Sequence, residues 1–434
     1  MPKRSKDRQP ERLDAPTSEN ISFGEDDGQN VYAQSRDEGH RIDPRAQRVF
    51  IMCIVLVVLF FLGLLIPKNM LNEGLNSTGY GQGYNLSWFI QGLSDNVNGL
   101  IAFFTGNQTG SAIFSNTFFR YIVVCLSGAG LALCGAVYQG SFRNALVSPS
   151  TLGVMSGASL GMVIWIVFFV SDEGDQIGWV SALVSGTSST SSGGISSADD
   201  LLATYGLSLL QFVGCAVVVV LVLLCMRFLG RFSKSNIVII IVGQVVGGVC
   251  GAIVNTVRYY YVTLDPEGVK AQLLTQLQIS SFYRSYSWID VLALLAPLAL
   301  CFAVIMHYRQ KMMVLGLGEE EARTLGVETR KMRIITITVC TLLTAIIVSF
   351  AGAVGFVGFL IPHLSRRIVG PNFKYLLPAA LVLGAIFVLG AYVLVSALFG
   401  SDYETMSGMY ISIFGAIVFL VVALRNKGGE RNGI

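Results

Sequence analysis

Apolar residues along this chain fall in blocks of about 20, which are separated by shorter polar and charged stretches. A helix of about 20 residues crosses the roughly 30 Å hydrocarbon core of a bilayer. The pattern therefore predicts an all-α, polytopic membrane helical bundle of about ten transmembrane helices. The predicted spans are 49–66, 120–140, 152–170, 206–228, 236–259, 288–307, 333–353, 355–369, 375–397 and 406–424.

Polar segments divide the rest of the chain. Residues 1–48 are charged and poor in apolar residues, which predicts a disordered tail. Residues 171–205 contain the tract SGTSSTSSGGISS, which is typical of a flexible loop without a core. The membrane domain is expected over 49–425, and a second tail follows over 426–434.

Charge distribution predicts the orientation of these spans. Of the 30 lysines and arginines, 25 fall in the two tails and in the loops on their side, and five fall on the other side. Because basic loops stay on the cytoplasmic side, both termini are expected in the cytoplasm and the 171–205 loop outside. All 8 cysteines lie within predicted spans, so neither a disulfide framework nor a metal cluster is indicated. Nucleic-acid binding is not indicated either.

A short charged segment, MVLGLGEEEARTLG over 313–326, separates the sixth and seventh predicted spans. Its three glutamates and its arginine cannot stay in hydrocarbon, so the segment must face water. Gly316 and Gly318 can end the preceding helix, and Gly326 can end a new helix that the acidic residues begin. We expect a surface helix over 315–326 that transmits force from a soluble partner. The alternative is a solvated connector.

Small and polar residues share one face of the fifth predicted span. Gln244, Gly248, Gly251 and Asn255 are separated by four, three and four residues, which places them on one side of a helix. Two side-chain amides and two glycines, which leave space beside the helix, suit the wall of a translocation path. The alternative is that the amides bond to neighbouring helices.

Glycines also repeat in the third span, where Gly153, Gly157 and Gly161 are four residues apart. This spacing makes a smooth strip along a helix. We expect another helix to pack closely against it.

Two loop motifs contain residues suited to helix ends. Arg143 and Asn144 follow the second span, where helix carbonyl groups need donors, and Pro149 can start the next helix. Pro362 is expected to interrupt the eighth span. His363 has no second ligand at metal-binding spacing, so a hydrogen bond at a helix end is favoured over a metal site.

Motifs for nucleotide binding and for a zinc-dependent hydrolase are missing from the sequence. It contains no G-x-x-x-x-G-K-[ST] or H-E-x-x-H motif. Its spans are nearly free of ionisable groups, whereas an ion-driven carrier normally needs buried charges. The chain is therefore expected to be a transport subunit that takes its energy from elsewhere, and not an enzyme.

Three segments, in order, resemble the FecCD-type permeases of bacterial ABC importers, which take up ferric siderophores, haem or cobalamin. The segments are YQGSFRNALVSPSTLGVMSGASLG (138–161), LGLGEEEARTLGV (315–327) and GAVGFVGFLIPHLSRR (352–367). The resemblance implies a type II ABC importer permease with ten helices per subunit, placed in the bacterial cytoplasmic membrane. This chain would bind no cofactor, and its partner would bind ATP and Mg.

The resemblance also implies partners. They are a second permease subunit, identical or different, a cytoplasmic ABC ATPase dimer and an extracytoplasmic substrate-binding protein. Arg120 matches one arginine of a motif that docks the binding protein, although Thr117 replaces the other. The ATPase-coupling residues would be Leu317, Gly318, Glu319, Glu320, Glu321, Ala322, Arg323, Leu325 and Gly326.

The leading functional hypothesis is the membrane subunit of an ATP-driven importer of a metal chelate. A secondary carrier without an ATPase is one alternative, which predicts transport by the purified chain alone. A membrane scaffold or receptor is another, which needs no polar stripe through the bilayer.

Overall fold

The computed structural model describes nine stretches of the chain, and those from Arg45 onward belong to one compact unit. Within these stretches the chain is helical apart from turns, short connections and one isolated antiparallel bridge between Ser281 and Gly352. The described residues are 43–66, 86–105, 108–145, 147–170, 198–229, 237–279, 281–282, 286–399 and 406–431.

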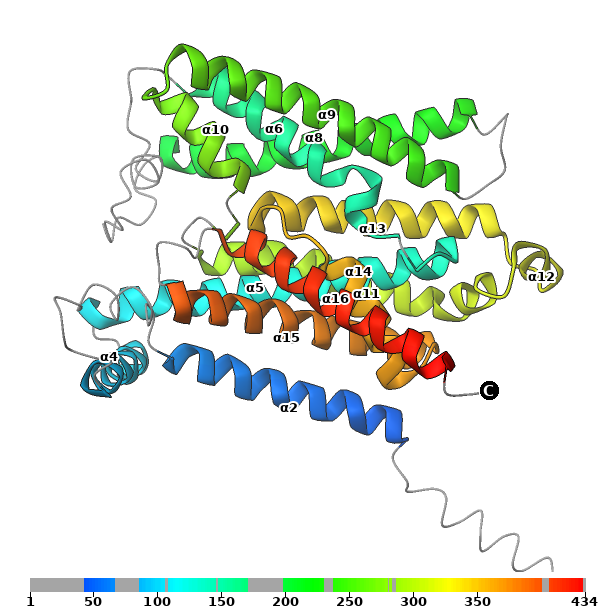
Figure 1. Ribbon diagram of the computed structural model, residues 1–434, viewed down its shortest axis with the longest axis horizontal. Coiled ribbons are helices and arrows are strands. Elements are labelled where there is room, and N and C mark those ends of the chain that lie inside the picture. The colour runs from blue at the N-terminus through cyan, green and yellow to red at the C-terminus, as the bar shows by residue number, and fades with distance from the viewer. Residues whose placement is uncertain are drawn as a thin grey trace, which may run out of the picture. The chain divides into compact units, whose positions relative to one another are not determined.

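The helices are labelled in Figure 1. In chain order they are α2 (Pro44–Leu65), α4 (Leu86–Thr105), α5 (Gln108–Phe142), η2 (Pro149–Leu152), α6 (Val154–Phe169), α8 (Ala198–Leu229), α9 (Ile237–Leu264), α10 (Val269–Ile279), α11 (Trp288–Leu315), α12 (Glu319–Thr324), α13 (Thr329–Ala351), α14 (Val357–Val369), α15 (Phe373–Phe399) and α16 (Ser407–Arg431).

The predicted polytopic membrane bundle is confirmed, because a helix occupies each of the ten predicted spans. Among the described residues, seven helices are long and apolar enough to cross a membrane: α2, α5, α8, α9, α11, α13 and α15. Shorter apolar helices fill the third and tenth predicted spans, at Val154–Phe169 and Ser407–Val421. The prediction for 355–369 needs correction, since α14 has only 13 residues, or about 20 Å of helix, and cannot cross alone.

The backbone explains why α14 is short. Gly352, which ends α13, pairs with Ser281, and the chain then runs without helical structure to Phe356. Phe356 has a φ of +63°, in the left-handed region, so a continuous helix from α13 into α14 is impossible. The connection therefore makes a sharp break inside the membrane domain.

Helix α5 lies at the centre of the larger group of helices and contacts α4, α11, α13, α14 and α15. Two of its glycines allow close approach of other backbones. A Cβ atom at Gly128 would lie 2.4 Å from the Gly384 carbonyl oxygen, and one at Gly135 would lie 1.8 Å from the Gly358 carbonyl oxygen. The Gly358 carbonyl group lies four residues before Pro362. Because proline has no backbone N–H, this carbonyl group receives no hydrogen bond within the helix.

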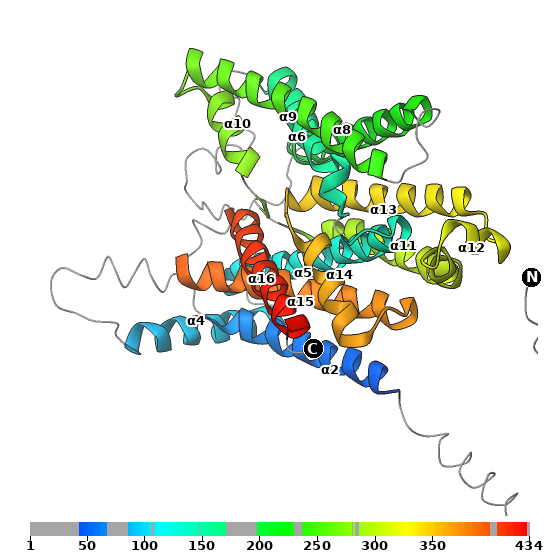
Figure 2. The ribbon, with the colours of Figure 1, turned by 45° about the vertical axis from the view of Figure 1, so that its right-hand side comes forward.

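Helices α6, α8, α9 and α10 form a second group, which Figures 1 and 2 show beside α13. The glycine strip of α6 packs as the sequence predicts. A Cβ atom at Gly157 would lie 2.7 Å from the Gly214 carbonyl oxygen, and one at Gly161 would lie 2.0 Å from that of Leu210. Both contacts belong to α8, so the strip holds α6 against α8.

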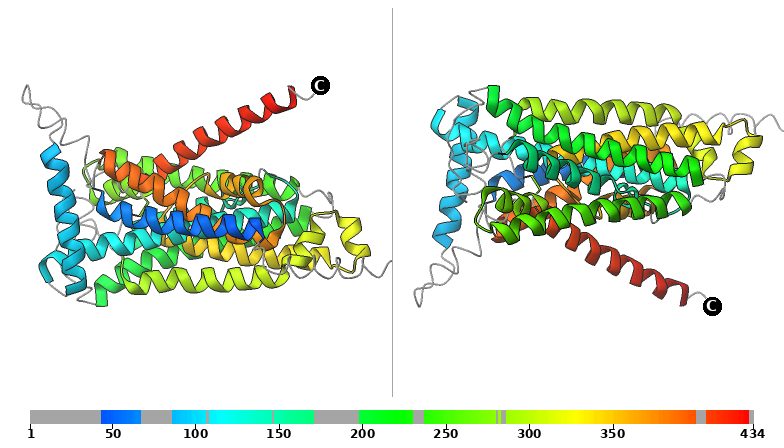
Figure 3. Two further views of the ribbon diagram at one scale, coloured as in Figure 1. Left: turned by 90° about the horizontal axis from the view of Figure 1, so that it is seen from below. Right: turned by 90° about the horizontal axis from the view of Figure 1, so that it is seen from above.

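The helices have two distinct ends, which we call the α4 end and the α12 end (Figure 3). At the α4 end, α4 lies across the long helices, and the Asn96 side-chain amide donates to the Leu65 and Ile66 carbonyl oxygens at 3.3 and 3.2 Å. At the α12 end, Arg48 near the start of α2 donates to the Ile368 carbonyl oxygen in α14. These hydrogen bonds cap carbonyl groups that helix ends leave unpaired.

Several predicted boundaries between the membrane domain and its flanking segments differ from those in the structure. Residues 198–205 form the first turns of α8 and not part of a loop. Residues 44–48 begin α2, and 426–431 continue α16. The remaining parts of the predicted tails and loop, 1–42, 171–197 and 432–434, lie outside the described residues.

Candidate coupling surface and translocation path

The charged segment between α11 and α13 forms the helix α12, which is shorter than predicted. Helix α11 continues to Leu315, and α12 covers only Glu319–Thr324 instead of 315–326. Gly318 has an extended backbone before α12, and Gly326 has a φ of +76°, which favours glycine and ends the turn. The Val327 amide donates to the Ala322 carbonyl oxygen at 2.9 Å and closes the segment.

Helix α12 and the residues that flank it, 317–325, form a mixed apolar and charged surface, which we call the α12 surface. Ala322 is fully buried against the bundle, whereas Leu317 and Leu325 are 60% and 62% exposed. Glu320, Glu321, Arg323 and Thr324 are exposed as well. Exposed apolar side chains among charged ones are typical of a protein contact surface.

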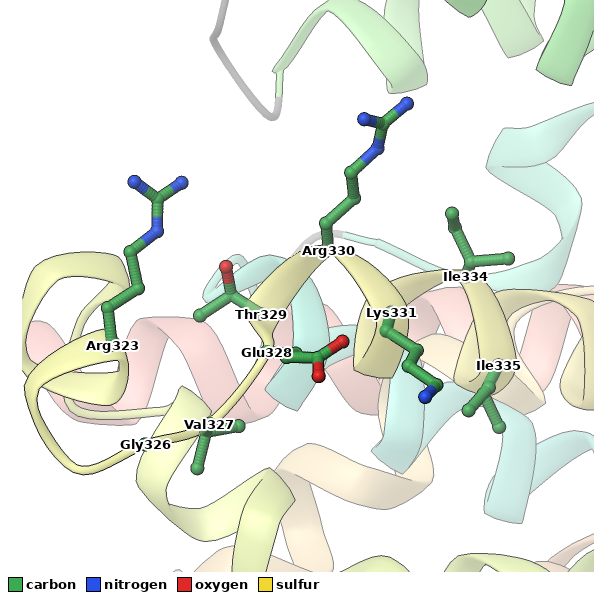
Figure 4. Close-up of a pocket in the computed structure, with 9 residues that line it drawn as sticks. All are labelled: Arg323, Gly326, Val327, Glu328, Thr329, Arg330, Lys331, Ile334 and Ile335. Carbon is green, nitrogen blue, oxygen red and sulfur yellow. The ribbon is translucent and has the colours of Figure 1, made fainter.

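A hollow of about 700 Å³ lies beside α12, at the start of α13 (Figure 4). Arg323 and Arg330 project to the same side of the ribbon in this view, with Thr329 between them. The lining residues are Arg323, Gly326, Val327, Glu328, Thr329, Arg330, Lys331, Ile334 and Ile335. The hollow extends the α12 surface, and the sequence did not indicate it.

The predicted path residues lie on one face of α9. Gln244, Gly248 and Asn255 are exposed, and Gly251 is partly exposed. A Cβ atom at Gly248 or Gly251 would meet no described atom within 4 Å. Neither glycine therefore packs against the described part of this chain.

The neighbouring face of α9, which carries Gly243 and Gly247, packs tightly. A Cβ atom at Gly243 would lie 2.8 Å from the Leu152 Cα atom, and one at Gly247 would lie 3.1 Å from the Gly153 Cα atom. Helix α9 thus has one glycine pair for packing and another that leaves open space. Residue type alone does not distinguish the pairs.

The two amides on the open face also contact neighbouring elements. Gln244 donates to the Thr151 carbonyl oxygen at 3.5 Å, and Gln278 of α10 donates to the Asn255 side-chain oxygen at 3.2 Å. Both alternatives for these amides therefore describe part of the geometry. The two side chains are exposed on the open face, and each also makes a hydrogen bond to a neighbouring element.

The sequence analysis missed two residues on this face, near the end of α9 that leads to α10. Gln278 reaches it from α10, and no spacing rule within α9 could reveal that contact. Tyr259 follows Asn255 by four residues and is 72% exposed. Its spacing from Asn255 was the available signal, since it continues the interval that joins the other four residues.

The loop motifs are brought together around α14. Pro149 is the first residue of η2 and is buried, and its Cδ atom would lie 2.7 Å from a Cβ atom at Gly358. Arg143 is exposed beyond the end of α5, with a φ of +52°, and Asn144 is partly buried. Pro149 therefore packs against α14, whereas Arg143 faces outward.

Pro362 and His363 both lie inside α14, not at its end. Pro362 is buried and α14 continues through it, so the predicted interruption at Pro362 is wrong. His363 is partly buried near the middle of the 13-residue helix, so its predicted helix-end position is also wrong. Gln139 of α5 donates to the Phe359 carbonyl oxygen at 3.0 Å and accepts a hydrogen bond from Arg366. These contacts tie α14 to α5.

Arg120 lies in the first half of α5, towards the α4 end. Its side chain is partly buried, and Thr117 lies three residues earlier. The α12 surface and Arg120 are therefore at opposite ends of the helices.

Long apolar helices, a short α14 that follows a sharp break and a projecting α12 are features of a membrane transport subunit. Residues 84–425 match the model of the FecCD transport family, and the chain belongs to that family. It is a permease subunit of an ABC importer.

Curated relatives of the chain have related descriptions. It is 30% identical over 314 residues to a molybdate import system permease protein from Haemophilus influenzae, covering 72% of this chain and 81% of the relative. It is 30% identical over 302 residues to an Fe(3+)-citrate import system permease protein from Bacillus subtilis, covering 69% and 78%. A cobalamin import system permease protein from Halobacterium salinarum is 29% identical over 308 residues, covering 71% and 72%.

A solved structure supports the same fold. The chain resembles a metal-chelate type ABC transporter in an inward-facing conformation, with a TM-score of 0.61 and 26% sequence identity. The match covers 88% of this chain and 99% of the solved chain.

Proposed function

We propose that this permease imports a metal chelate, such as a ferric siderophore, haem or cobalamin, with energy from a separate ATPase. The observation that carries the proposal is the α12 surface, where Leu317 and Leu325 are exposed among charged residues. Two exposed leucines among charged side chains suit a contact with a protein partner. An ATPase dimer that binds ATP and Mg is that partner, and this chain binds no cofactor.

The charges at the two ends of the helices support an orientation in the membrane. Arg48, Arg367 and Lys374 are among the exposed cations near the α12 end, where α2 begins and α14 ends. Basic residues accumulate on the cytoplasmic side of membrane proteins. We place the α12 end and both termini in the cytoplasm of a bacterium, and the α4 end outside, where Arg120 contacts a substrate-binding protein.

The open face of α9 supports the choice of a chelate. Gln244, Gly248, Gly251 and Asn255 offer amides and space, and the one cation of α9, Arg258, is partly buried beyond them. A small oxyanion is normally held by arginine, lysine or convergent N–H groups, whereas a bulky chelate needs width and weak polar contacts. Relatives named for Fe(3+)-citrate and cobalamin support this class over the molybdate of another relative.

A second permease subunit supplies the other wall of the path. No described residue covers the α9 face at Gly248 and Gly251, so one chain forms only one side. The partner subunit is either a second copy or a related chain, and its α9 would face this one across the path.

The test reverses two charges on α12. Replacing Glu320→Lys and Glu321→Lys together should reduce co-purification of the cognate ATPase and chelate uptake, because both side chains are exposed on the proposed docking surface. Exposed ion pairs contribute only about 0–1 kcal/mol each, so the double variant is preferred over either single one.

The matched control is Asp265→Lys with Glu267→Lys. These two acids are exposed in the turn between α9 and α10, towards the other end of the helices, and their reversal makes the same charge change. The control should retain the ATPase. Unchanged ATPase binding and uptake in the Glu320 and Glu321 variant would contradict the assignment of α12.

A further inference from the structure

We propose that the hollow between α12 and α13 receives an acidic segment of the partner ATPase, so that docking uses this site as well as α12 itself. The inference rests on the proposed function and adds a second contact site to it. It also states the chemistry of the ATPase segment: a carboxylate-bearing stretch with at least one apolar side chain.

Charge is the first argument for this occupant. Arg323, Arg330 and Lys331 line the hollow, and Glu328 is the one acidic residue among its nine lining residues. Arg330 and Lys331 are exposed, so their charges act on whatever enters. A site with this excess of positive charge attracts carboxylates and disfavours basic segments.

Apolar side chains supply the second argument. Val327 is buried at the base of the segment, and Ile334 is 50% exposed one turn along α13 from Arg330. Figure 4 shows Arg323, Arg330 and Ile334 extending to the same side of the ribbon. An occupant must therefore meet guanidinium groups and an aliphatic side chain together, which a segment of folded protein can do.

Position is the third argument. The hollow is continuous with the α12 surface, because Arg323 belongs to α12 and also lines the hollow. Helix α12 projects at the end of the long helices, as Figure 3 shows, so a protein docked on Leu317 and Leu325 is already adjacent to the hollow. Anionic lipid headgroups share the charge but do not account for the two exposed leucines beside them.

The experiment measures the dissociation constant of the purified cognate ATPase for the detergent-solubilised permease over a range of salt concentrations. Arg330→Glu with Lys331→Glu should weaken binding about tenfold at low salt, since two favourable contacts become repulsive. The salt dependence of binding should also become shallower, because fewer opposite charges meet.

The matched control is Arg309→Glu with Lys311→Glu. Both residues are in the last two turns of α11, near the same end of the helices, and neither lines the hollow. The control makes the same change in net charge and should alter the dissociation constant less than about twofold, as expected for charges outside an interface. Equal effects of the two variants would show a general charge effect and would overturn the proposal.

A photo-crosslinking residue at Ile334 identifies the occupant directly. Mass spectrometry should recover an ATPase peptide that contains aspartate or glutamate from the crosslinked complex. A crosslink to another protein segment would refute the proposal. An effect of Arg330→Glu with Lys331→Glu that appears only in nanodiscs with phosphatidylglycerol, and not in detergent, would assign the hollow to lipid instead.

The outcomes separate this inference from the proposed function. If Glu320→Lys with Glu321→Lys weakens ATPase binding but Arg330→Glu with Lys331→Glu does not, α12 docks the ATPase and the hollow does not. If the wild-type permease does not bind the ATPase, the proposed function itself is wrong.

Discussion

Helices α5 and α9 are both long, apolar and rich in glycine, yet the chain surrounds them to very different degrees. In the most apolar stretch of α5, 83% of the residues are buried, whereas in that of α9 only 22% are buried. Every α5 glycine discussed above meets another backbone, but Gly248 and Gly251 of α9 meet nothing within 4 Å. A glycine in a membrane helix is thus a close contact in one place and open space in another.

The difference follows from position in the bundle. Helix α5 has neighbours on all sides, so omission of a Cβ atom allows another helix to approach. Helix α9 contacts α6, α8 and α10 on one side, and its other side is left to lipid, substrate or another subunit. Glycine therefore allows close helix packing where a helix face is covered, and it leaves open space where the face is uncovered.

The largest expected effect is on α5. Gly135→Val should prevent recovery of folded permease, because the Cβ atom would lie 1.8 Å from the Gly358 carbonyl oxygen and the two backbones would have to separate. Overpacking typically costs about 1–3 kcal/mol, and here the obstacle is backbone that cannot change rotamer. The measurement is the yield of monodisperse protein on size-exclusion chromatography. Gly248→Val should retain the wild-type yield, and equal losses would remove the distinction between the helices.

A loss of transport without a loss of folding is expected on α9. Gly248→Trp or Gly251→Trp should block chelate uptake in reconstituted vesicles and leave ATP hydrolysis by the complex intact, since the indole fills the path and α12 is untouched. The control is Leu300→Trp on α11, where the side chain is 67% exposed. It should transport normally.

Two other outcomes would contradict this prediction. Aggregated Gly248→Trp protein, or complexes that lack the ATPase, would show that this face packs against a second subunit and does not line a path. Normal uptake by both tryptophan variants would remove α9 from the path altogether.

Much of the fold was predictable because hydrophobic blocks set the position of membrane helices in the sequence. The blocks place the cores of α2, α5, α8, α13 and α15 within a few residues. The break before α14 was not predictable, since it depends on a left-handed Phe356 and on the Ser281–Gly352 bridge, which joins residues far apart in sequence. The start of α8 was missed because its first residues are polar.

The candidate sites divide in the same way. Spacing within one helix placed Gln244, Gly248, Gly251 and Asn255 on a common face, and glutamates placed α12 in water. Contacts between elements were beyond reach, as with Gln278 on Asn255 and the hollow formed where α12 turns into α13. The sequence pattern within one helix predicts the face on which a residue lies. The neighbours of that face are known only from the three-dimensional fold.

The smallest expected effect compares one hydrogen bond on each helix. Tyr138 of α5 and Thr341 of α13 are buried, and their hydroxyl groups are 2.7 Å apart. Asn255 and Gln278 make their 3.2 Å hydrogen bond at an exposed position. An unmade hydrogen bond is costly when its partner is left buried, and much less costly when water or another polar group can replace it.

Double-mutant cycles should therefore give different coupling energies for the two pairs. We expect about 1 kcal/mol for Tyr138→Phe with Thr341→Val, and less than about 0.5 kcal/mol for Asn255→Ala with Gln278→Ala. The measurement is the free energy of unfolding of the detergent-solubilised permease by chemical denaturant. A coupling on α9 as large as that on α5 would mean that the Asn255 face is sealed from water. In that case the open side of α9 would be a packing surface, and the contrast between the helices would no longer hold.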